Sequence, residues 1–293
     1  MATRPLATLA VGAVCISFAA IFVKLIDPAA MGPTGIGFWR AGMGAAVLFA
    51  WSFAAGERLR LPPGLLAWTV LAGFVFYLDL FFWHRSIVFS GAGMATILAA
   101  TQVFVTATLG RFLFSERLTW RLILAAVSGV VGVALLVGIG SGVEFTPRYA
   151  AGIVYGLVTG IAYGSYIVIL KNVGLRSPRL DFRVVLAWTS TFTAVFMGLS
   201  GWLEGDTLVV PDITSGLVLF GLALTAQVLG WWIISTTMPK LKTAHGSLIL
   251  LLQPVLATVW GFLIFHEVLT ALQIVGAVVT LAAIYAGSVR RSH

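Results

Sequence analysis

Ten apolar segments alternate with short polar links along the chain. A helix needs about 20 apolar residues to cross the roughly 30 Å hydrocarbon core of a bilayer. The hydrophobic positions run continuously instead of alternating, which favours membrane-spanning helices over the strands of a closed barrel. The sequence therefore predicts an all-α integral membrane protein with ten transmembrane helices, at 5–26, 33–55, 64–85, 91–114, 119–139, 149–171, 182–203, 213–236, 243–265 and 271–289.

Proline positions agree with these boundaries. Nine of the 10 prolines fall at proposed helix ends or in links, where a missing backbone N–H costs little. The exception is Pro254, which stands in the middle of the ninth segment. We expect a kinked helix there, with the carbonyl of Leu250 released from its helical hydrogen bond.

One pattern occurs in both halves of the chain. The stretches "ILAATQVFVTATLGRFLFSE" and "LILLLQPVLATVWGFLIFHE" carry Gln and Glu at the same spacing, so that Gln102 lies 151 positions before Gln253 and Glu116 lies 151 before Glu267. The pattern predicts two five-helix repeats, 1–142 and 143–293. Because five is an odd number, the second repeat must enter the membrane in the opposite orientation to the first.

The charges of the links support this inversion. Cytoplasmic links are enriched in Lys and Arg, so the basic side of the bundle indicates its orientation. With a cytoplasmic amino terminus, 14 basic residues fall inside and 3 outside, which predicts that both termini are cytoplasmic. The inside group is Arg4, Arg58, Arg60, Arg111, Arg117, Arg121, Lys171, Arg176, Arg179, Arg183, Lys240, Lys242, Arg290 and Arg291, and the outside group is Lys24, Arg85 and Arg148.

Composition excludes an ordinary soluble protein. The 293 residues are 60% hydrophobic and 10% charged, with a mean hydropathy of +1.04, whereas soluble chains carry roughly 25% charged residues. The net charge of +8 is spread singly and in pairs between apolar runs, so we expect no nucleic-acid partner. The first apolar segment is longer than the core of a typical signal peptide and is interpreted as an uncleaved helix.

Inverted five-plus-five repeats resemble the architecture of secondary transporters. The sequence resembles the drug/metabolite transporter superfamily, in its ten-helix type with the EamA repeat. The resemblance is carried by Glu116 before "RLTWRLILAAVSGVVGVALL", Glu267 before "VLTALQIVGAVVTLAAIYA", and Arg40 in "GFWRAGMGA". Within that superfamily the chain is most similar to the bacterial aromatic amino acid exporter group. This resemblance implies a monomeric inner-membrane exporter of small amphipathic metabolites, most plausibly aromatic or other bulky apolar amino acids, that works by alternating access.

Polar residues inside spans are the candidate site, because a buried polar group in lipid faces the bundle interior or a water-filled cavity. Asp79 is the only acidic residue well inside a span, and helical spacing puts Phe76 and Trp83 on its face. That face suits an ammonium group, which a carboxylate and aromatic rings both attract. The alternative is a structural ion pair between Asp79 and Arg40.

His84 follows on the same span and is a candidate for binding a carboxylate or titrating during transport; an interfacial position beside Arg85 is the alternative. Proton coupling through Asp79 or His84 is a further hypothesis. No metal site is expected, because the four histidines have no ligand spacing. No cofactor is expected either.

Further candidates lie on the fourth, sixth, eighth and ninth spans. Gln102 and Gln253 offer amide groups to a zwitterion, or alternatively join neighbouring helices. Glycines at every fourth position of the sixth span, Gly152, Gly156, Gly160 and Gly164, predict close helix packing. The remaining predicted pocket residues are Tyr163, Gln227 and Trp231. Glu116 and Glu267 are interpreted either as caps of the fifth and tenth helices or as groups that close the two mouths of the transporter.

Other function classes find less support. An integral membrane enzyme needs a clustered catalytic set, which the spans do not contain. A channel needs a filter or a charged ring, and nothing in the sequence resembles either. The phosphate-binding pattern GxxxxGK[ST] is absent, so ATP is not expected as the direct energy source. A helical scaffold remains as a further alternative.

Overall fold

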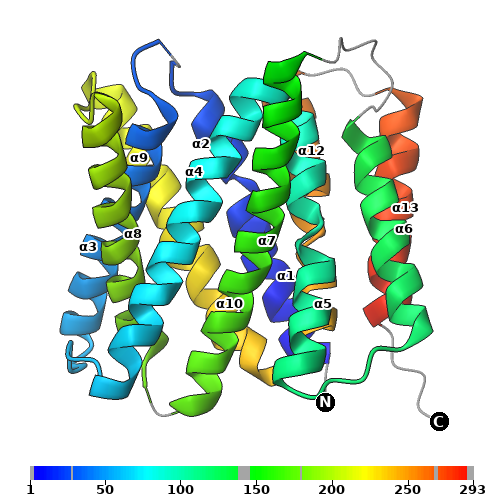
Figure 1. The fold of residues 1–293 in the computed structure, drawn as a ribbon, viewed down its shortest axis with the longest axis horizontal. Helices are drawn as coiled ribbons and strands as arrows, with labels where there is room; N and C mark the ends of the chain where they lie inside the picture. The colour runs from blue at the N-terminus through cyan, green and yellow to red at the C-terminus, as the bar shows by residue number, and fades with distance from the viewer. Residues whose placement is uncertain (1–2, 28, 138–145, 179, 267–269, 289–293) are drawn as a thin grey trace.

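The computed structural model describes residues 3–27, 29–137, 146–178, 180–266 and 270–288 as a bundle of helices (Figure 1). The helices are α1 (Thr3–Ser17), α2 (Ala19–Lys24), α3 (Pro33–Ala54), α4 (Pro63–Ala100), α5 (Gln102–Leu113), α6 (Trp120–Val137), α7 (Pro147–Arg176), α8 (Phe182–Glu204), α9 (Ile213–Leu222), the π-helix η1 (Ala223–Gly230), α10 (Trp231–Thr237), the short η2 (Met238–Lys240), α11 (Thr243–Ile249), α12 (Leu252–Phe265) and α13 (Ala271–Ser288).

These helices form the ten predicted spans. Eight helical segments of the described chain are long and apolar enough to cross a membrane, and α6 and α13 supply two shorter apolar helices. The predicted all-helical membrane fold is confirmed. One boundary differs, because the third and fourth spans, Pro63–Ser90 and Met94–Leu113, follow each other with no helix end between them.

The two halves run in opposite directions through the membrane. In Figure 1, α1 begins at the lower end of the bundle, whereas α7, the first helix of the second half, begins at the upper end and descends. Helix α13 ends at the lower end again, on the side where α1 begins. The predicted inversion of the repeat is therefore visible in the fold.

Local backbone structure repeats with nearly the same offset as the sequence. The fourth span breaks between α4 and α5 at Thr101, and the ninth span breaks between α11 and α12 at Leu250 and Leu251, one or two positions short of the 151-residue offset. Ser115 and His266, also 151 positions apart, have the positive φ angles of 52° and 54°. Such a backbone is uncommon for residues other than glycine, so its occurrence at equivalent positions is evidence for two copies of one unit.

Helices of the first half pack against helices of the second. Helix α3 packs against α8, and α6 packs against α13. Helix α7 lies against both α4 and α5, and its four regularly spaced glycines are the contact surface. A Cβ atom on Gly160 would lie 2.3 Å from Thr101 Oγ1 and 2.7 Å from the carbonyl oxygen of Leu98. The predicted role of these glycines in close packing is confirmed.

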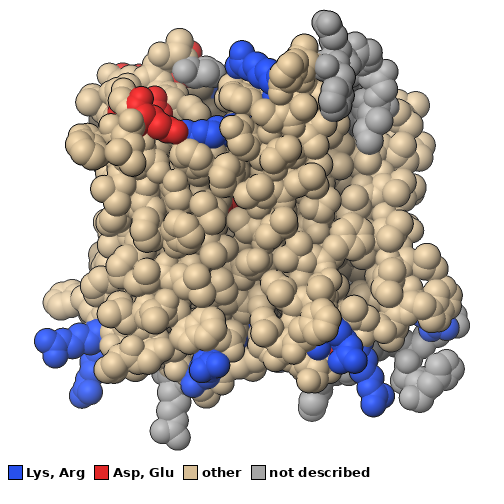
Figure 2. Space-filling view, viewed as in Figure 1, with Lys and Arg blue, Asp and Glu red and all other residues tan. Residues whose placement is uncertain are grey.

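The surface separates into three zones. Figure 2 shows most of the visible Lys and Arg side chains along the lower edge, acidic side chains together with some basic ones near the upper edge, and mostly uncharged atoms between. We call the end of the bundle where α1 begins the basic face and the opposite end the acidic face. Large apolar side chains between them are exposed, such as Val154 at 57% and Val278 at 60%. An uncharged apolar belt of this kind is the surface that lipid contacts.

Candidate functional site

A cavity lies near the middle of the bundle, where helices of the two halves meet. Its empty volume, which includes open space outside its mouth, is about 840 Å³. The lining residues are Ile16, Ser17, Ala19, Ala20, Arg40, Phe76, Asp79, Leu80, Trp83, Thr96, Ala99, Ala100, Gln102, Thr159, Tyr163, Trp231, Leu250, Leu251, Gln253, Pro254 and Ala257.

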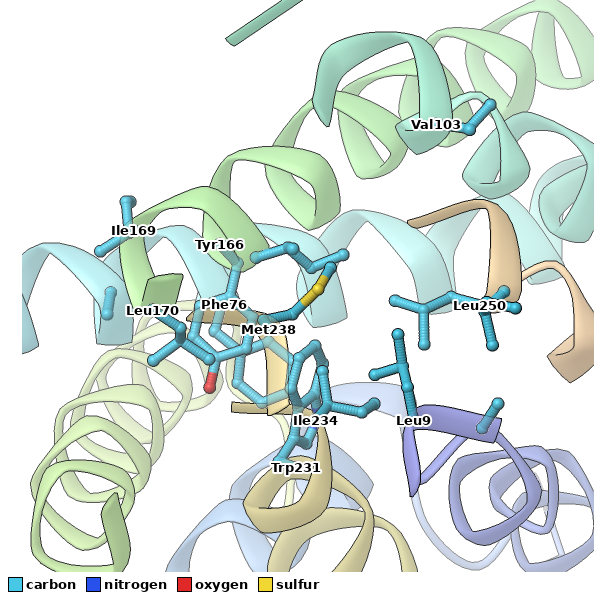
Figure 3. Close-up of a cluster of buried hydrophobic side chains, with 14 of the residues drawn as sticks. Leu9, Phe76, Val103, Tyr166, Ile169, Leu170, Trp231, Ile234, Met238 and Leu250 are labelled. Atoms are coloured by element: carbon cyan, nitrogen blue, oxygen red, sulfur yellow. The ribbon is translucent and has the colours of Figure 1, made fainter. Parts of the chain in front are cut away.

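The chain direction of these helices shows that the cavity occupies the half of the bundle nearer the acidic face. Helix α4 rises toward that face, so Trp83 lies above Asp79 and Asp79 above Phe76. Below the cavity, buried side chains fill the interior, and Figure 3 shows several of them, among them Leu9, Tyr166 and Met238. The cavity is therefore closed toward the basic face by packed side chains.

Arg40 enters the cavity from α3 and is held in place from behind. Its Nε donates to Oε1 of Gln227 at 3.3 Å, and Nε2 of Gln227 donates to Oγ of Ser190 at 2.9 Å. Gln227 lies in the π-helix η1, a rare helix form that is frequent at functional sites. Gly44 makes room for it, because a Cβ atom there would lie 2.5 Å from Cγ of Gln227.

Asp79 lines the same cavity from α4, but it is not the ion-pair partner of Arg40. Both residues are buried, with 8% and 4% of their surfaces exposed. Among the described residues, no ion pair within 4.0 Å joins them. The structural ion pair considered from the sequence is thus not formed, since the guanidinium is turned toward Gln227.

Aromatic rings form one wall of the cavity. The Phe76 ring stacks on Tyr166 with a centroid distance of 4.4 Å and meets Trp231 edge-on at 5.3 Å. Tyr163 also meets Trp231 edge-on, at 5.8 Å. The hydroxyl of Tyr163 and the amide of Gln253 hydrogen-bond each other, with Nε2 of Gln253 donating at 2.9 Å. These contacts fix the rings, so the wall is rigid.

Most of the predicted pocket residues meet at this cavity. Arg40, for which we considered a structural ion pair, also lines the cavity, and so does Pro254. The lining includes the following predicted residues: Phe76, Asp79, Trp83, Gln102, Tyr163, Trp231 and Gln253. Gln102 also joins helices, because its Nε2 donates to the carbonyl oxygen of Ser247 at 3.1 Å. Both roles that we considered for this amide are thus compatible with its position.

Two predicted contact residues lie outside the lining. His84 is buried beside Trp83, with their ring centroids 5.1 Å apart, but one step along a helix turns it away from the cavity. Gln227 is buried behind Arg40 and contacts the site only through it.

The carbonyl of Leu250, which we expected to be free of helical hydrogen bonding, accepts from the N–H of Gln253 at 3.1 Å. The chain forms a tighter turn at the break, and this turn satisfies the carbonyl.

Glu116 lies far below the cavity at the basic face, in a cluster that ties the two halves together. Its carboxylate accepts from Nζ of Lys171 at 2.6 Å and from the backbone N–H of Thr243 at 2.8 Å. It therefore caps α11 of the second half. The prediction that it caps the fifth helix is wrong, because the hydroxyl of Thr119 takes that position by accepting from the N–H of Leu122 at 3.3 Å. Glu267 lies outside the described residues.

A pair of lysine and phenylalanine contacts was missed from the sequence. Nζ of Lys171 lies 4.8 Å from the centroid of the Phe114 ring, and Nζ of Lys24 lies 4.3 Å from that of Phe265. Phe114 and Phe265 are 151 positions apart and the two lysines are 147 apart, so the contacts occupy corresponding regions of the two repeats. Each lysine comes from the other half of the chain, and the two contacts lie at opposite faces. The equal spacing of the phenylalanines is the signal that was available in the sequence.

Comparison with known proteins agrees with this geometry. The EamA-like transporter family matches the chain twice, at residues 4–138 and 150–288. The chain belongs to this family. It is therefore a multi-pass membrane protein of a family of transporters. Among the described residues, no group of three or more His, Cys, Asp or Glu side chains is arranged to hold a metal ion.

Several individual proteins resemble this EamA-like transporter. It is 27% identical over 200 residues to the "Probable amino-acid metabolite efflux pump" of Salmonella typhimurium, and 26% identical over 200 residues to the protein of the same name from Escherichia coli. Each match covers 66% of this chain and 66% of the relative, just under two thirds of its length. The "Uncharacterized transporter YdfC" of Bacillus subtilis is 25% identical over 257 residues, with 86% of this chain and 80% of that protein covered.

A solved crystal structure has the same fold. It superposes with a TM-score of 0.82 at 19% sequence identity, and the match covers 98% of this chain and 96% of the other.

Proposed function

We propose that this transporter exports small amphipathic metabolites, in particular aromatic and other bulky apolar amino acids, across the bacterial inner membrane by alternating access. The observation that carries the proposal is the cavity between the two inverted halves, which combines an aromatic wall with buried charged groups. Inverted repeats around a central site near broken helices are the architecture of alternating access. The names of the Salmonella and Escherichia relatives add support for amino acids.

Orientation is the second part of the proposal. Exposed Lys and Arg residues gather at the face where α1 begins, and basic links remain in the cytoplasm. We therefore assign the basic face to the cytoplasm, with both termini on that side. In this orientation the cavity is closed toward the cytoplasm by the packing around Tyr166 and Met238. The structure then corresponds to the stage of transport at which a substrate has left the cytoplasmic side.

The test is counterflow of labelled L-phenylalanine in liposomes that contain the purified protein. We expect uptake to be competed by aromatic and bulky aliphatic amino acids and only weakly by glycine. Trp231 is 2% exposed and forms part of the aromatic wall, so the Trp231→Ala variant should abolish counterflow. The matched control is Trp202→Ala, because Trp202 is 76% exposed and should not matter. Counterflow of another metabolite class, with no competition by amino acids, would overturn the substrate assignment.

A further inference from the structure

We infer that the cavity recognises the zwitterionic head group of an α-amino acid through both of its charges. The guanidinium of Arg40 binds the carboxylate, and the carboxylate of Asp79 binds the ammonium group. The ligand side chain then lies against the rings of Tyr163 and Trp231. This inference rests on the proposed function and deepens it, because it separates amino acids from amines and from carboxylic acids.

The first argument is the cost of two separate buried charges. Removing a charge from water is expensive unless an opposite charge compensates it in good geometry. Arg40 and Asp79 attract each other across one cavity, but no ion pair within 4.0 Å joins them, so neither buried charge is fully compensated. A zwitterion carries the two complementary charges on neighbouring atoms and neutralises both side chains at once. An amine or a carboxylic acid would compensate one of them and leave the other.

The second argument is the orientation of Arg40. Its Nε is occupied by Gln227, whose own amide is anchored on Ser190. Neither Nη atom donates to another described residue in a hydrogen bond of the structure. The outer edge of a guanidinium, with two parallel N–H donors, matches the two oxygens of a carboxylate. Gln227 is therefore a positioning residue that fixes the guanidinium from behind.

The third argument is the surroundings of Asp79. Asp79 is buried, with 8% of its surface exposed, and its carboxylate accepts no hydrogen bond from a described residue. It lies one helical turn above Phe76, and the guanidinium carbon of Arg40 lies 5.7 Å from the centroid of that ring. Both charged groups therefore lie near Phe76 in one cavity, close enough for one small ligand to contact both.

The position of the charges relative to the halves adds a consequence. Arg40 and Asp79 belong to α3 and α4 of the first half, whereas Tyr163 and Trp231 belong to the second half. A bound amino acid would hold its head group on one half and its side chain on the other. The ligand would then connect the two halves. A molecule that lacks the charged head group or the apolar side chain cannot make this connection.

The experiment uses the full chain in lipid nanodiscs and three ligands of similar shape. L-phenylalanine carries both charges, phenethylamine lacks the carboxylate, and 3-phenylpropionate lacks the ammonium group. We expect L-phenylalanine to bind at least about 30-fold more tightly than either analogue, the low end for removing one partner of a buried charge pair. This comparison needs only the unaltered protein, so it does not depend on the folding of any variant.

Variants then assign each charge to its residue. In Arg40→Gln, L-phenylalanine and phenethylamine should bind about equally, while 3-phenylpropionate remains weak. In Asp79→Asn, 3-phenylpropionate should approach L-phenylalanine instead. The matched control is Arg85→Gln, since Arg85 pairs with Glu204 outside the cavity lining and should leave all three affinities unchanged.

The possible failures can be told apart. Equal binding of the three ligands to the unaltered protein would overturn this inference while leaving amino acid export intact. Unchanged discrimination in a folded Arg40→Gln protein would overturn the role of Arg40. If labelled L-phenylalanine neither binds nor undergoes counterflow, and no other amino acid competes, the proposed function itself fails.

Discussion

We predict that Glu116→Ala opens the transporter toward the basic face. The carboxylate of Glu116 is the anion for Lys171, and the side chains of the two residues are 10% and 5% exposed. The ammonium group of Lys171 also donates to the carbonyl oxygen of Leu241 at 2.6 Å and to Oγ1 of Thr243 at 3.0 Å. The contacts of Glu116 with Lys171 and with Thr243 join the first half to the second, whereas those of Lys171 with Leu241 and Thr243 lie within the second half. We expect the contacts of Glu116 to exist only while the basic face is closed.

The magnitude follows from the burial of this pair. Removing one partner of a buried ion pair costs about 3 to 5 kcal/mol, because the remaining charge is left uncompensated. In an open state both side chains would be hydrated, so removing the carboxylate of Glu116 destabilises mainly the closed state. Taking the low value, about 3 kcal/mol shifts the ratio of closed to open molecules roughly a hundredfold toward the open form.

Cysteine accessibility measures this shift. Cys15 is the only cysteine, so Cys15→Ser gives a background for Thr106→Cys. Thr106 is 0% exposed below the cavity, where its hydroxyl donates to Oγ of Ser247 at 2.7 Å. We expect a water-soluble maleimide to modify this cysteine slowly in the parent protein and much faster when Glu116→Ala is added. Equal rates in folded protein would refute the reasoning.

Two comparison variants sharpen the result. Glu57 lies at the same face, but it is 43% exposed and 3.8 Å from Arg183. Exposed pairs contribute only about 0 to 1 kcal/mol, so Glu57→Ala should not change the labelling rate. Combining Glu116→Ala with Lys171→Met removes both charges and should label more slowly than Glu116→Ala alone, because no uncompensated charge remains.

Two other predictions concern the helix breaks and the packing of α7. Gly160→Leu should prevent assembly of the bundle, seen as loss of the monodisperse peak in size-exclusion chromatography, because even its Cβ would meet the backbone of Leu98 at 2.7 Å. Val158→Leu on the same helix, at a partly exposed position, is the control. Pro254→Ala should retain counterflow, because the equivalent break at Thr101 forms without a proline. A loss of counterflow in this variant at an unchanged protein level would mean that the proline itself maintains the second break.

The spans and their inversion could be predicted because lipid leaves a chain few alternatives. Every backbone group in the bilayer must be satisfied within a helix, so the apolar segments and the basic links determine the topology. The break near Pro254 was also predictable from the missing N–H. Its counterpart at Thr101 was not, because no proline marks it.

Contacts across the bundle were harder to predict. Periodicity indicated that Asp79 faces inward, but it did not show whether Arg40 would pair with it or with Gln227, which lies 187 positions further along the chain. The partner of Glu116 was misjudged for the same reason. Local spacing favoured the nearby fifth helix, while the folded chain brings Thr243 to the carboxylate. Which residues meet depends on how the helices pack, and one sequence does not contain that information in a local pattern.

The corresponding contacts of Lys171 with Phe114 and of Lys24 with Phe265 have a consequence for the transport cycle. Each half places a phenylalanine against a lysine of the other half, at opposite ends of the bundle. We therefore expect each half to be able to adopt the shape that the other half has in this structure. Exchanging the two shapes would give the arrangement related by a two-fold rotation, closed at the acidic face and open at the basic face. The protein would need no unfolding and no additional element to complete such a cycle.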